Sequence, residues 1–200
     1  MSAKGTRSHR PPQVLLIVGA PGVGKTTVLD AVTELLTAHG VAHASLETEH
    51  LAQVVPRAGL SLILDALPGV WAAMRAHGVL RLVLTHTCEA VDDVAALAAS
   101  LTDTTLAVVA LQAPPAILRD RIRSRGEPAH ITDHLLDVAS RVEGVAALVN
   151  PVRLVDTSVT ATSHTAQQLA DVTGWLSDNR TSPVRAGRRR TFIQGSPPSG

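Results

Sequence analysis

The chain has 200 residues, a formal net charge of +1 and 45% hydrophobic residues. These values suit one globular domain with its own core and exclude a chain that is disordered throughout. Its single cysteine, Cys88, excludes an internal disulfide framework, and no apolar stretch approaches the roughly 20 residues of a membrane span. We therefore expect a soluble, cytoplasmic protein with no membrane partner.

Strand and helix patterns alternate along most of the chain. In chain order, the expected strands cover residues 14–18, 42–46, 80–84, 106–111 and 152–155. The expected helices cover residues 25 to about 39, 60–76 with an interruption at Pro68-Gly69, 91–101, 114–125, a segment from a Thr132 cap to about 149, and 165–176 with Ser163 as a candidate cap. Five apolar strands separated by helices predict an α/β fold with a parallel sheet covered on both faces.

Both ends of the chain carry clusters of basic residues. We expect residues 1–12 to form a flexible basic segment, residues 13–177 to form the domain, and residues 178–200 to form a disordered basic tail. The tail contains Arg188, Arg189 and Arg190, which could bind nucleic acid weakly and in a salt-sensitive way. A solvated tail without a partner explains the same residues, so nucleic acid is not the expected partner.

A glycine-rich loop follows the first apolar strand and precedes the first helix. Residues 19–26, GAPGVGKT, match the pattern G-x-x-x-x-G-K-[ST], and the whole chain has only two lysines, Lys4 and Lys25. Such a loop points backbone N–H groups at a phosphate, and the helix N-terminus adds a partial positive charge. The loop therefore predicts a nucleotide site with Mg²⁺ bound by the Thr26 hydroxyl. The expected nucleotide contacts are Gly19, Ala20, Pro21, Gly22, Val23, Gly24, Lys25, Thr26 and Thr27.

Two large branches of the P-loop proteins lack support in this sequence. A GTPase would need an Asn-Lys-x-Asp base reader, and the chain has no lysine in that context. Motor and AAA-type ATPases usually carry an acidic pair at the end of an apolar strand. The nearest candidate is Asp65, but the residues before it have helical spacing and Ala66 follows it. A strand that ends at Asp65 remains the alternative.

A basic segment late in the chain points to the small P-loop kinases. Residues 116–127, AILRDRIRSRGE, resemble the L-x-x-R-[IL]-x-x-R helix that enters the lid of adenylate, shikimate and gluconate kinases. The resemblance implies that Arg121 lies against the adenine ring, that Arg125 reaches the transferring phosphate, and that residues 126–131 belong to a lid. A guanidinium can stack on a base and bind phosphate oxygens, which suits a chain with few aromatic residues. The alternative is a solvated basic helix face.

The resemblance covers most of residues 13–177, including residues 154–158, LVDTS, which resemble a strand end that passes near the adenine in P-loop kinases. In layout the chain is also similar to short bacterial ATP-binding kinase-like proteins of unassigned substrate. The implied fold is a three-layer P-loop NTPase fold.

An acidic pair follows the second predicted strand. In many related kinases an Asp-x-Asp at this place orients or deprotonates the acceptor hydroxyl and helps to hold Mg²⁺, and this chain has Glu47 and Glu49 instead. Proton abstraction needs a carboxylate within hydrogen-bond reach, so glutamate is chemically acceptable. An exposed acidic turn is the alternative interpretation.

The third predicted strand ends without the aspartate that several relatives have there. Thr85, His86 or Glu89 could take its place, most simply through water. His130 and His134 have i, i+4 spacing but no further ligands, so we expect a helix-surface pair rather than a metal site.

The functional prediction is a phosphotransferase that moves the γ-phosphate of Mg·ATP to a small-molecule or nucleotide acceptor. Its expected catalytic residues are Lys25, Arg125, Glu47 and Glu49. The alternative is a nucleotide-dependent switch or an ATP-binding regulatory protein without small-molecule kinase activity. The sequence does not identify the acceptor, and it leaves the oligomeric state open, with a homodimer as one alternative.

Overall fold

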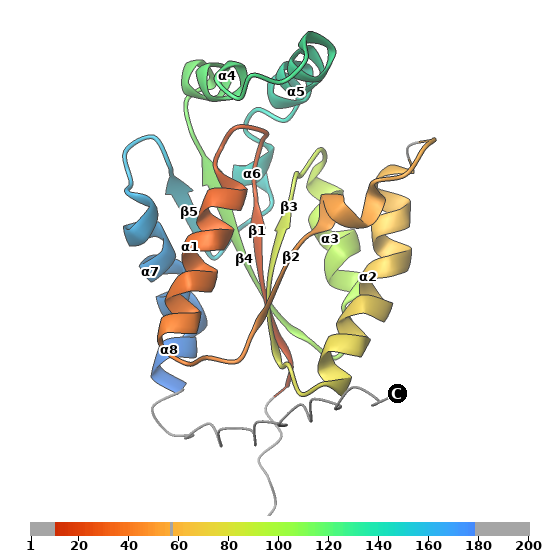
Figure 1. The fold of residues 1–200 in the computed structure, drawn as a ribbon, viewed down its shortest axis with the longest axis vertical. Coiled ribbons are helices and arrows are strands. Elements are labelled where there is room, and N and C mark those ends of the chain that lie inside the picture. The colour runs from red at the N-terminus through yellow and green to blue at the C-terminus, as the bar shows by residue number, and fades with distance from the viewer. Residues whose placement is uncertain (1–10, 57, 179–200) are drawn as a thin grey trace, which may run out of the picture.

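The protein is built around a five-stranded sheet whose strands are all parallel (Figure 1). A computed structural model describes residues 11–56 and 58–178. The strands are β1 (Gln13–Val18), β2 (Ala44–Glu47), β3 (Arg81–His86), β4 (Thr105–Gln112) and β5 (Arg153–Asp156), and their order across the sheet is β2-β3-β1-β4-β5. This arrangement confirms the predicted α/β fold.

Helices cover both faces of this sheet, and further helices stand over one end of it (Figure 1). The helices are α1 (Lys25–Ala38), η1 (Thr48–Ala52), α2 (Gly59–Ala76), α3 (Val91–Ser100), α4 (Pro115–Arg123), α5 (Ala129–Arg141), α6 (Val145–Leu148), α7 (Thr162–Thr173) and α8 (Trp175–Asp178). The α1, α7 and α8 helices lie on one face, and α2 and α3 lie on the other.

The central strand β1 explains the two-sided core. Its residues alternate between the faces, because successive side chains in a strand point in opposite directions. Leu15 and Ile17 pack in the cluster under α1 and α7, whereas Val14, Leu16 and Val18 pack in the cluster under α2 and α3. All five are at most 1% exposed, so the apolar run predicts correctly a strand buried on both faces.

Pro68 does not interrupt α2, which runs without a break from Gly59 to Ala76. The predicted interruption at Pro68-Gly69 is therefore wrong. A proline inside a helix removes one backbone hydrogen bond. Leu67 and Trp71 on either side of it are fully buried in the same cluster, so tertiary packing holds the helix together across the proline.

The helix predicted from a Thr132 cap to residue 149 is divided differently. Thr132 lies inside α5, which begins at Ala129 directly after Pro128, and the chain then turns at Gly144, whose φ is 80°, before the short α6. Ser163 is likewise inside α7 rather than its cap. Pro128 before the first turn of α5 and the left-handed Gly144 beyond its last turn set the boundaries of α5.

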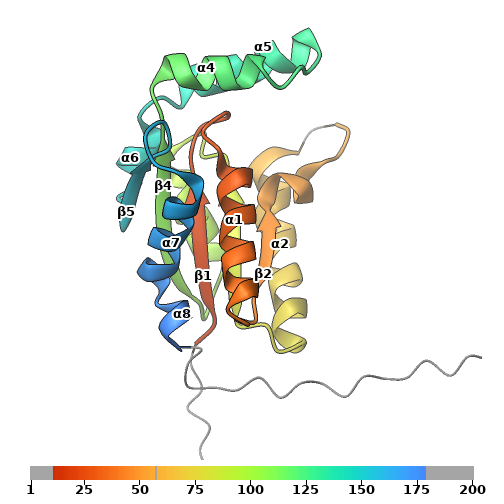
Figure 2. The same ribbon diagram turned by 60° about the vertical axis from the view of Figure 1, so that its left-hand side comes forward.

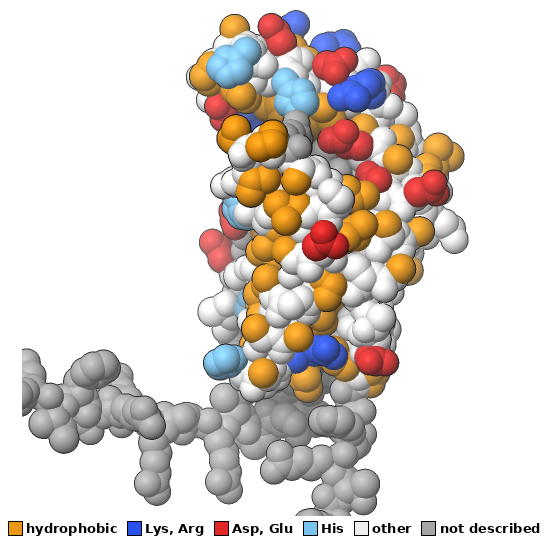
Figure 3. All heavy atoms as spheres, turned by 90° about the vertical axis from the view of Figure 1, so that its right-hand side faces the viewer, with side chains coloured by type: hydrophobic (Ala, Val, Ile, Leu, Met, Phe, Trp, Pro, Cys, Tyr) orange, Lys and Arg blue, Asp and Glu red, His pale blue; other side chains and the backbone are white. Residues whose placement is uncertain are grey.

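The α4 and α5 helices form a separate layer above the carboxyl ends of the strands (Figure 2). The glycine-rich loop, between β1 and α1, lies at this same end of the sheet (Figure 1). On the face seen in Figure 3, the lysine and arginine side chains gather mainly near this layer, and apolar side chains dominate below it. The α4 and α5 layer, called the lid below, therefore brings basic groups to the end of the sheet where the loop lies.

Several sequence predictions fall outside residues 11–56 and 58–178. They concern the basic segment before residue 11 and the tail after residue 178, including Arg188, Arg189 and Arg190. Within the described ranges, the structure has no helix of the length and apolarity that crossing a membrane would require.

Candidate active site

The glycine-rich loop curls tightly between β1 and α1. A Cβ atom at Gly19 would lie 2.7 Å from the carbonyl oxygen of Leu111, and one at Gly22 would lie 2.9 Å from that of Leu118. Gly22 also has a φ of 80°, which side chains rarely adopt. Glycine is therefore required at both positions by the backbones of β4 and α4, which approach the loop closely.

Lys25 is the first residue of α1, and its side chain turns back onto the loop. Its Nζ donates hydrogen bonds to the carbonyl oxygens of Gly19 at 3.0 Å and Ala20 at 3.1 Å. The pKa of Lys25 is lowered to about 8, mainly by burial and to a smaller extent by Arg125, whereas the nearby Glu49 raises it. The ammonium group is thus the cation at the centre of the loop.

Thr26 and Glu47 connect the loop to the neighbouring strand β2. The Thr26 hydroxyl donates a hydrogen bond of 2.7 Å to Oε2 of Glu47. Glu47 is the last residue of β2, so the parallel sheet brings its carboxylate to the N-terminus of α1. With its proton committed to Glu47, the Thr26 oxygen keeps its lone pairs for another partner.

A smaller cavity of about 380 Å³ lies on the side of the loop that faces α4 and α7. Arg121 crosses it: its guanidinium donates to the hydroxyl of Thr157 at 3.0 Å, to the carbonyl oxygen of Thr157 at 2.8 Å and to that of Val23 at 3.3 Å. Arg121 therefore joins α4, the loop and the end of β5 into one wall. The contact with Thr157 was not predicted, although both residues stood in segments singled out from the sequence.

Arg125 lines this cavity and the next one. The helix predicted to run to residue 125 is shorter, because α4 ends at Arg123 and Arg125 lies in the turn that follows. Gly126, with a φ of 68°, terminates the helix there. The guanidinium of Arg125 is exposed and stands between the two cavities.

A larger cavity of about 790 Å³ opens on the other side of the loop. It contains Lys25, Thr26, Glu47 and Glu49, so the structure brings these predicted residues together in one space. One of its walls comes from α2 and the lid and is apolar or basic, with Leu60, Ile63, His134, Leu135, Val138 and Arg141.

Sequence reasoning missed this second wall. His134 is exposed, as expected for half of a helix-surface pair with His130, and it also lines the larger cavity, which was not predicted. The spacing of α5 could have predicted an inward face, because Leu135 and Val138 repeat at three residues and Val138 is buried. Which element that face would meet depends on how the lid folds over the sheet.

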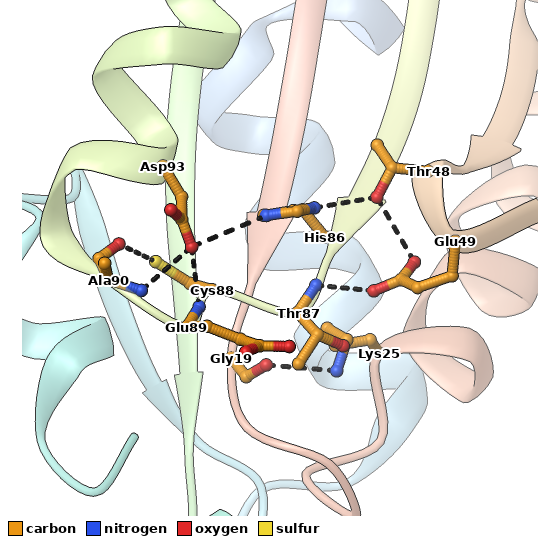
Figure 4. A network of polar contacts seen from close by, with 10 residues as sticks. All are labelled: Gly19, Lys25, Thr48, Glu49, His86, Thr87, Cys88, Glu89, Ala90 and Asp93. Carbon is orange, nitrogen blue, oxygen red and sulfur yellow. Dashed lines mark hydrogen bonds and ion pairs between the residues drawn. The ribbon is translucent and has the colours of Figure 1, made fainter. Parts of the chain in front are cut away.

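Both carboxylate oxygens of Glu49 lie close to polar groups of other residues (Figure 4). Its Oε1 accepts a bond of 2.6 Å from the backbone N–H of Thr87, and its Oε2 lies 3.3 Å from the hydroxyl of Thr48. Burial raises the pKa of Glu49, but a hydrogen bond from the Thr87 side chain and the charge of Lys25 outweigh burial and lower the pKa below its usual range. Glu49 is therefore an ionised carboxylate with a fixed direction.

Three residues at the end of β3 were candidates for a magnesium-organising role. Thr85 is fully buried and does not line the larger cavity, whereas His86 and Glu89 do. The Nδ1 atom of His86 lies 2.8 Å from the Thr48 hydroxyl, and its Nε2 lies 3.9 Å from Oδ2 of Asp93. Within residues 11–56 and 58–178, no cluster of three or more histidine, cysteine or acidic side chains has an arrangement that could hold a metal.

Cys88 follows the same strand and lies against the start of α3. Its Sγ donates to the carbonyl oxygen of Ala90 at 2.9 Å, and burial together with Asp93 raises the pKa of the thiol to about 11. A thiol with that pKa is almost entirely protonated at neutral pH, so Cys88 is not an activated nucleophile.

Comparisons with known structures agree on the fold. The chain is similar to the tunicamycin resistance protein of Deinococcus radiodurans, at 23% identity and a TM-score of 0.56, with 82% of this chain and 96% of that one covered. It is similar to shikimate kinase of Acinetobacter baumannii in complex with shikimate, at 20% identity and a TM-score of 0.52, with coverages of 84% and 94%. It is also similar to the APS kinase of Mycobacterium tuberculosis in complex with AMPPNP and APS, at 18% identity and a TM-score of 0.59, with coverages of 83% and 99%.

Comparisons by sequence match a family model but no curated protein. No curated protein matches the chain significantly. A family model described as the AAA ATPase domain matches residues 3–149. The sequence argument that set AAA-type ATPases aside is corrected by this match, even though Asp65 lies on the exposed side of α2 and ends no strand. The missing acidic pair therefore does not separate the chain from that family. The chain belongs to the AAA ATPase domain family and has the nucleotide-binding P-loop fold seen in small kinases.

Proposed function

We propose that the protein transfers the γ-phosphate of Mg·ATP to a hydroxyl group of a small-molecule or nucleotide acceptor. One observation carries this proposal: a single cavity contains both Lys25 of the phosphate loop and the ionised carboxylate of Glu49. A donor phosphate on the loop and an acceptor hydroxyl on Glu49 would then face each other without a wall between them. Bringing two reactants together in this way supplies much of the rate in phosphoryl transfer.

The loop would hold the donor. Its backbone N–H groups and the N-terminus of α1 would bind the β- and γ-phosphates, and the ammonium of Lys25 would neutralise charge that develops on the transferring group. In the structure Lys25 contacts the carbonyl oxygens of Gly19 and Ala20, so its side chain points at the loop.

The residues around Thr26 fit a magnesium ion. Mg²⁺ prefers oxygen ligands and keeps several waters, and the Thr26 oxygen has free lone pairs because its proton is donated to Glu47. Glu47 would thereby orient Thr26, as carboxylates beyond the first ligands commonly do. The bound ion would supply positive charge against the phosphate oxygens.

Glu49 would act on the acceptor. Its carboxylate would accept a hydrogen bond from the acceptor hydroxyl and take the proton as the oxygen forms its bond to the γ-phosphorus. At the same time the bond between that phosphorus and the β,γ-bridging oxygen breaks, and ADP leaves. The charge balance is complete without any further reactant.

The two arginines of the lid segment would serve different parts of the donor. Arg125 stands between the two cavities, where its guanidinium could reach the transferring phosphate. Arg121 lines only the smaller cavity, on the side where the nucleoside would lie. We therefore assign Arg125 to the chemical step and Arg121 to nucleotide binding.

Labelled ATP tests this function directly. The purified protein is incubated with γ-labelled ATP, Mg²⁺ and a panel of metabolites that carry hydroxyl groups, and labelled products are separated. We expect label in one class of acceptor, and we expect Lys25→Ala to lose that transfer while it retains a cooperative unfolding transition. Equal transfer by Lys25→Ala and the wild type would refute the mechanism.

A nucleotide-dependent switch or regulatory ATP-binding role is the second candidate. The AAA ATPase domain match favours it, because nucleotide hydrolysis rather than transfer would then be the reaction. The same experiment separates the two: tight ATP binding with label released only as inorganic phosphate, or retained in ATP, would favour this candidate.

A further inference from the structure

The hydroxyl of Thr48 lies between two groups that can both accept its proton (Figure 4). Thr48 is fully buried. Its Oγ1 is 2.8 Å from Nδ1 of His86 and 3.3 Å from Oε2 of Glu49. A hydroxyl has one proton to donate, so it can make only one of these two bonds as a donor.

The proton on His86 decides which bond Thr48 donates. A neutral histidine carries its proton on one of two nitrogens. If Nε2 carries it, bare Nδ1 accepts the Thr48 proton, and Oε2 of Glu49 receives none. If Nδ1 carries it, Nδ1 donates to Thr48, and the Thr48 proton must turn to Glu49.

The surroundings of Nε2 favour the proton on that nitrogen. The 2.8 Å contact between Thr48 and Nδ1 is a hydrogen bond in which either group can be the donor. Nε2 faces Oδ2 of Asp93 at 3.9 Å, and a carboxylate on that side favours N–H over a bare lone pair.

His86 is a neutral imidazole surrounded by charged side chains. It is 4% exposed, and burial lowers its pKa. The charged groups that face it are Glu49 from η1, Asp93 from α3, Glu89 from the turn before α3, and Lys25 from α1. Asp93 is itself fixed, since its Oδ2 accepts the backbone N–H groups of Glu89 at 2.7 Å and of Ala90 at 2.8 Å.

We propose that Asp93 and His86 are positioning residues that direct the Thr48 hydroxyl away from Glu49, so that Oε2 of Glu49 stays free to receive the proton of the acceptor. The role of Glu49 in this inference rests on the proposed phosphotransferase function. The direction of the hydrogen bond does not, because it concerns the protein without any ligand.

The consequence for Glu49 is chemical. A hydrogen bond donated to a carboxylate stabilises its charged form and makes it a weaker base. Glu49 already accepts one bond from the Thr87 amide. A further bond, from Thr48 to Oε2, would lower the basicity of Glu49 further, so transfer to an acceptor would slow.

Removing His86 and then Thr48 tests this direction. His86→Leu replaces the ring with an apolar side chain of similar bulk and leaves Glu49 as the acceptor that the Thr48 hydroxyl already contacts. We expect the pKa of Glu49 to fall by about 0.5 to 1, and kcat to fall about threefold to tenfold with little change in the KM for ATP. In the double variant with Thr48→Val, the competing hydroxyl is gone, and we expect both quantities to return toward the wild-type values.

The rescue distinguishes the proposal from a structural role. If His86 only fills space, Thr48→Val adds a second defect, and the double variant is worse than His86→Leu. That outcome would overturn the proposal. Thr48→Ser in the His86→Leu background is the matched control, because it keeps the hydroxyl, and we expect it to give no rescue.

Nuclear magnetic resonance gives a measurement that needs no acceptor and no activity. The ¹⁵N shifts of His86 in the ligand-free wild type are expected to report a proton on Nε2, and Asp93→Asn is expected to increase the share of the form with the proton on Nδ1. Asparagine keeps an oxygen for the Glu89 and Ala90 amides, so α3 keeps its cap. A proton on Nδ1 in the wild type would overturn the proposal and leave the phosphotransferase function standing. If no acceptor is found, a ¹³C titration of Glu49 measures whether its pKa returns toward the wild-type value in the double variant.

Discussion

Arg121→Ala is expected to destabilise the protein and to weaken nucleotide binding together. Arg121 makes three hydrogen bonds across the smaller cavity, two to Thr157 and one to Val23. Their removal separates α4 from the end of β5 and from the phosphate loop. The loop residues then lose a support as well as a candidate nucleotide contact.

The magnitude follows from the charge and the exposure of the arginine. A hydrogen bond to a charged group contributes about 1.5 to 3 kcal/mol. Arg121 is half-buried, and water can replace part of the lost contacts, so we expect a loss of about 2 to 3 kcal/mol for the whole residue. For a domain of this size, that corresponds to a fall in Tm of about 4 to 12 °C.

Differential scanning calorimetry with and without Mg·ATP measures both effects. Arg123→Ala is the matched control, since Arg123 is an exposed arginine of the same helix, and its Tm should stay within about 2 °C of the wild type. An equal loss in both variants would mean that α4 contributes only its general charge, and the reasoning from the Arg121 contacts would be refuted.

Three further predictions follow from other contacts. Arg125→Ala is expected to lower kcat about 100-fold or more while ATP affinity changes less than threefold, and rapid-quench kinetics with a binding titration measure the two; a change in affinity alone would count against the assignment to the chemical step. Glu47→Gln keeps an acceptor for Thr26 but removes a charge, so the Mg²⁺ concentration for half-maximal ATP binding should rise about threefold to tenfold in calorimetric titrations, and an unchanged value would separate Glu47 from the magnesium site. Asp156 has a lowered pKa because the Ser158 hydroxyl and amide donate to it, so its stabilising effect is present above its ordinary pKa of 3.8 and is lost as the pH falls through the lower folded value. Urea unfolding of Asp156→Asn should therefore show a smaller loss of stability than the wild type on acidification below about pH 4, and parallel curves would contradict this.

The strands of the sheet were predictable because each one is a short apolar run in the sequence. The run from Val14 to Val18 is apolar at every position, which is typical of a strand covered on both faces or of a buried helix. The glycine-rich loop that follows leaves too few residues for a helix. The local sequence pattern did not predict that β1 pairs with β3 and β4, because strand order and register arise from pairing between distant segments.

The nucleotide side of the candidate site was more predictable than the acceptor side. Gly19 to Thr27 are contiguous, so one motif describes them. The larger cavity is lined by elements that lie far apart in the sequence, and His134 reaches it only because α5 folds over the carboxyl ends of the strands. The contact between His86 and Thr48 joins residues 38 positions apart, and no spacing rule connects them.

Pro68 illustrates how packing overrides a local rule. The proline predicted a break in the helix, yet α2 continues through it because Leu67 and Trp71 bury their side chains in the same core. The helix predicted from residue 132 to about 149 was wrong because local signals were overlooked. The apolar spacing suggested one long helix, whereas Pro128 sets the start of α5 and Gly144 separates α5 from α6.

A crystal structure with Mg²⁺ and a non-hydrolysable ATP analogue tests the central claim most directly. The account predicts phosphates on the backbone N–H groups of the loop, Mg²⁺ beside the Thr26 hydroxyl, the nucleoside in the smaller cavity against Arg121, and the γ-phosphate facing Glu49 across the larger cavity. A nucleotide bound away from the loop, or one whose γ-phosphate is separated from Glu49 by protein, would contradict it.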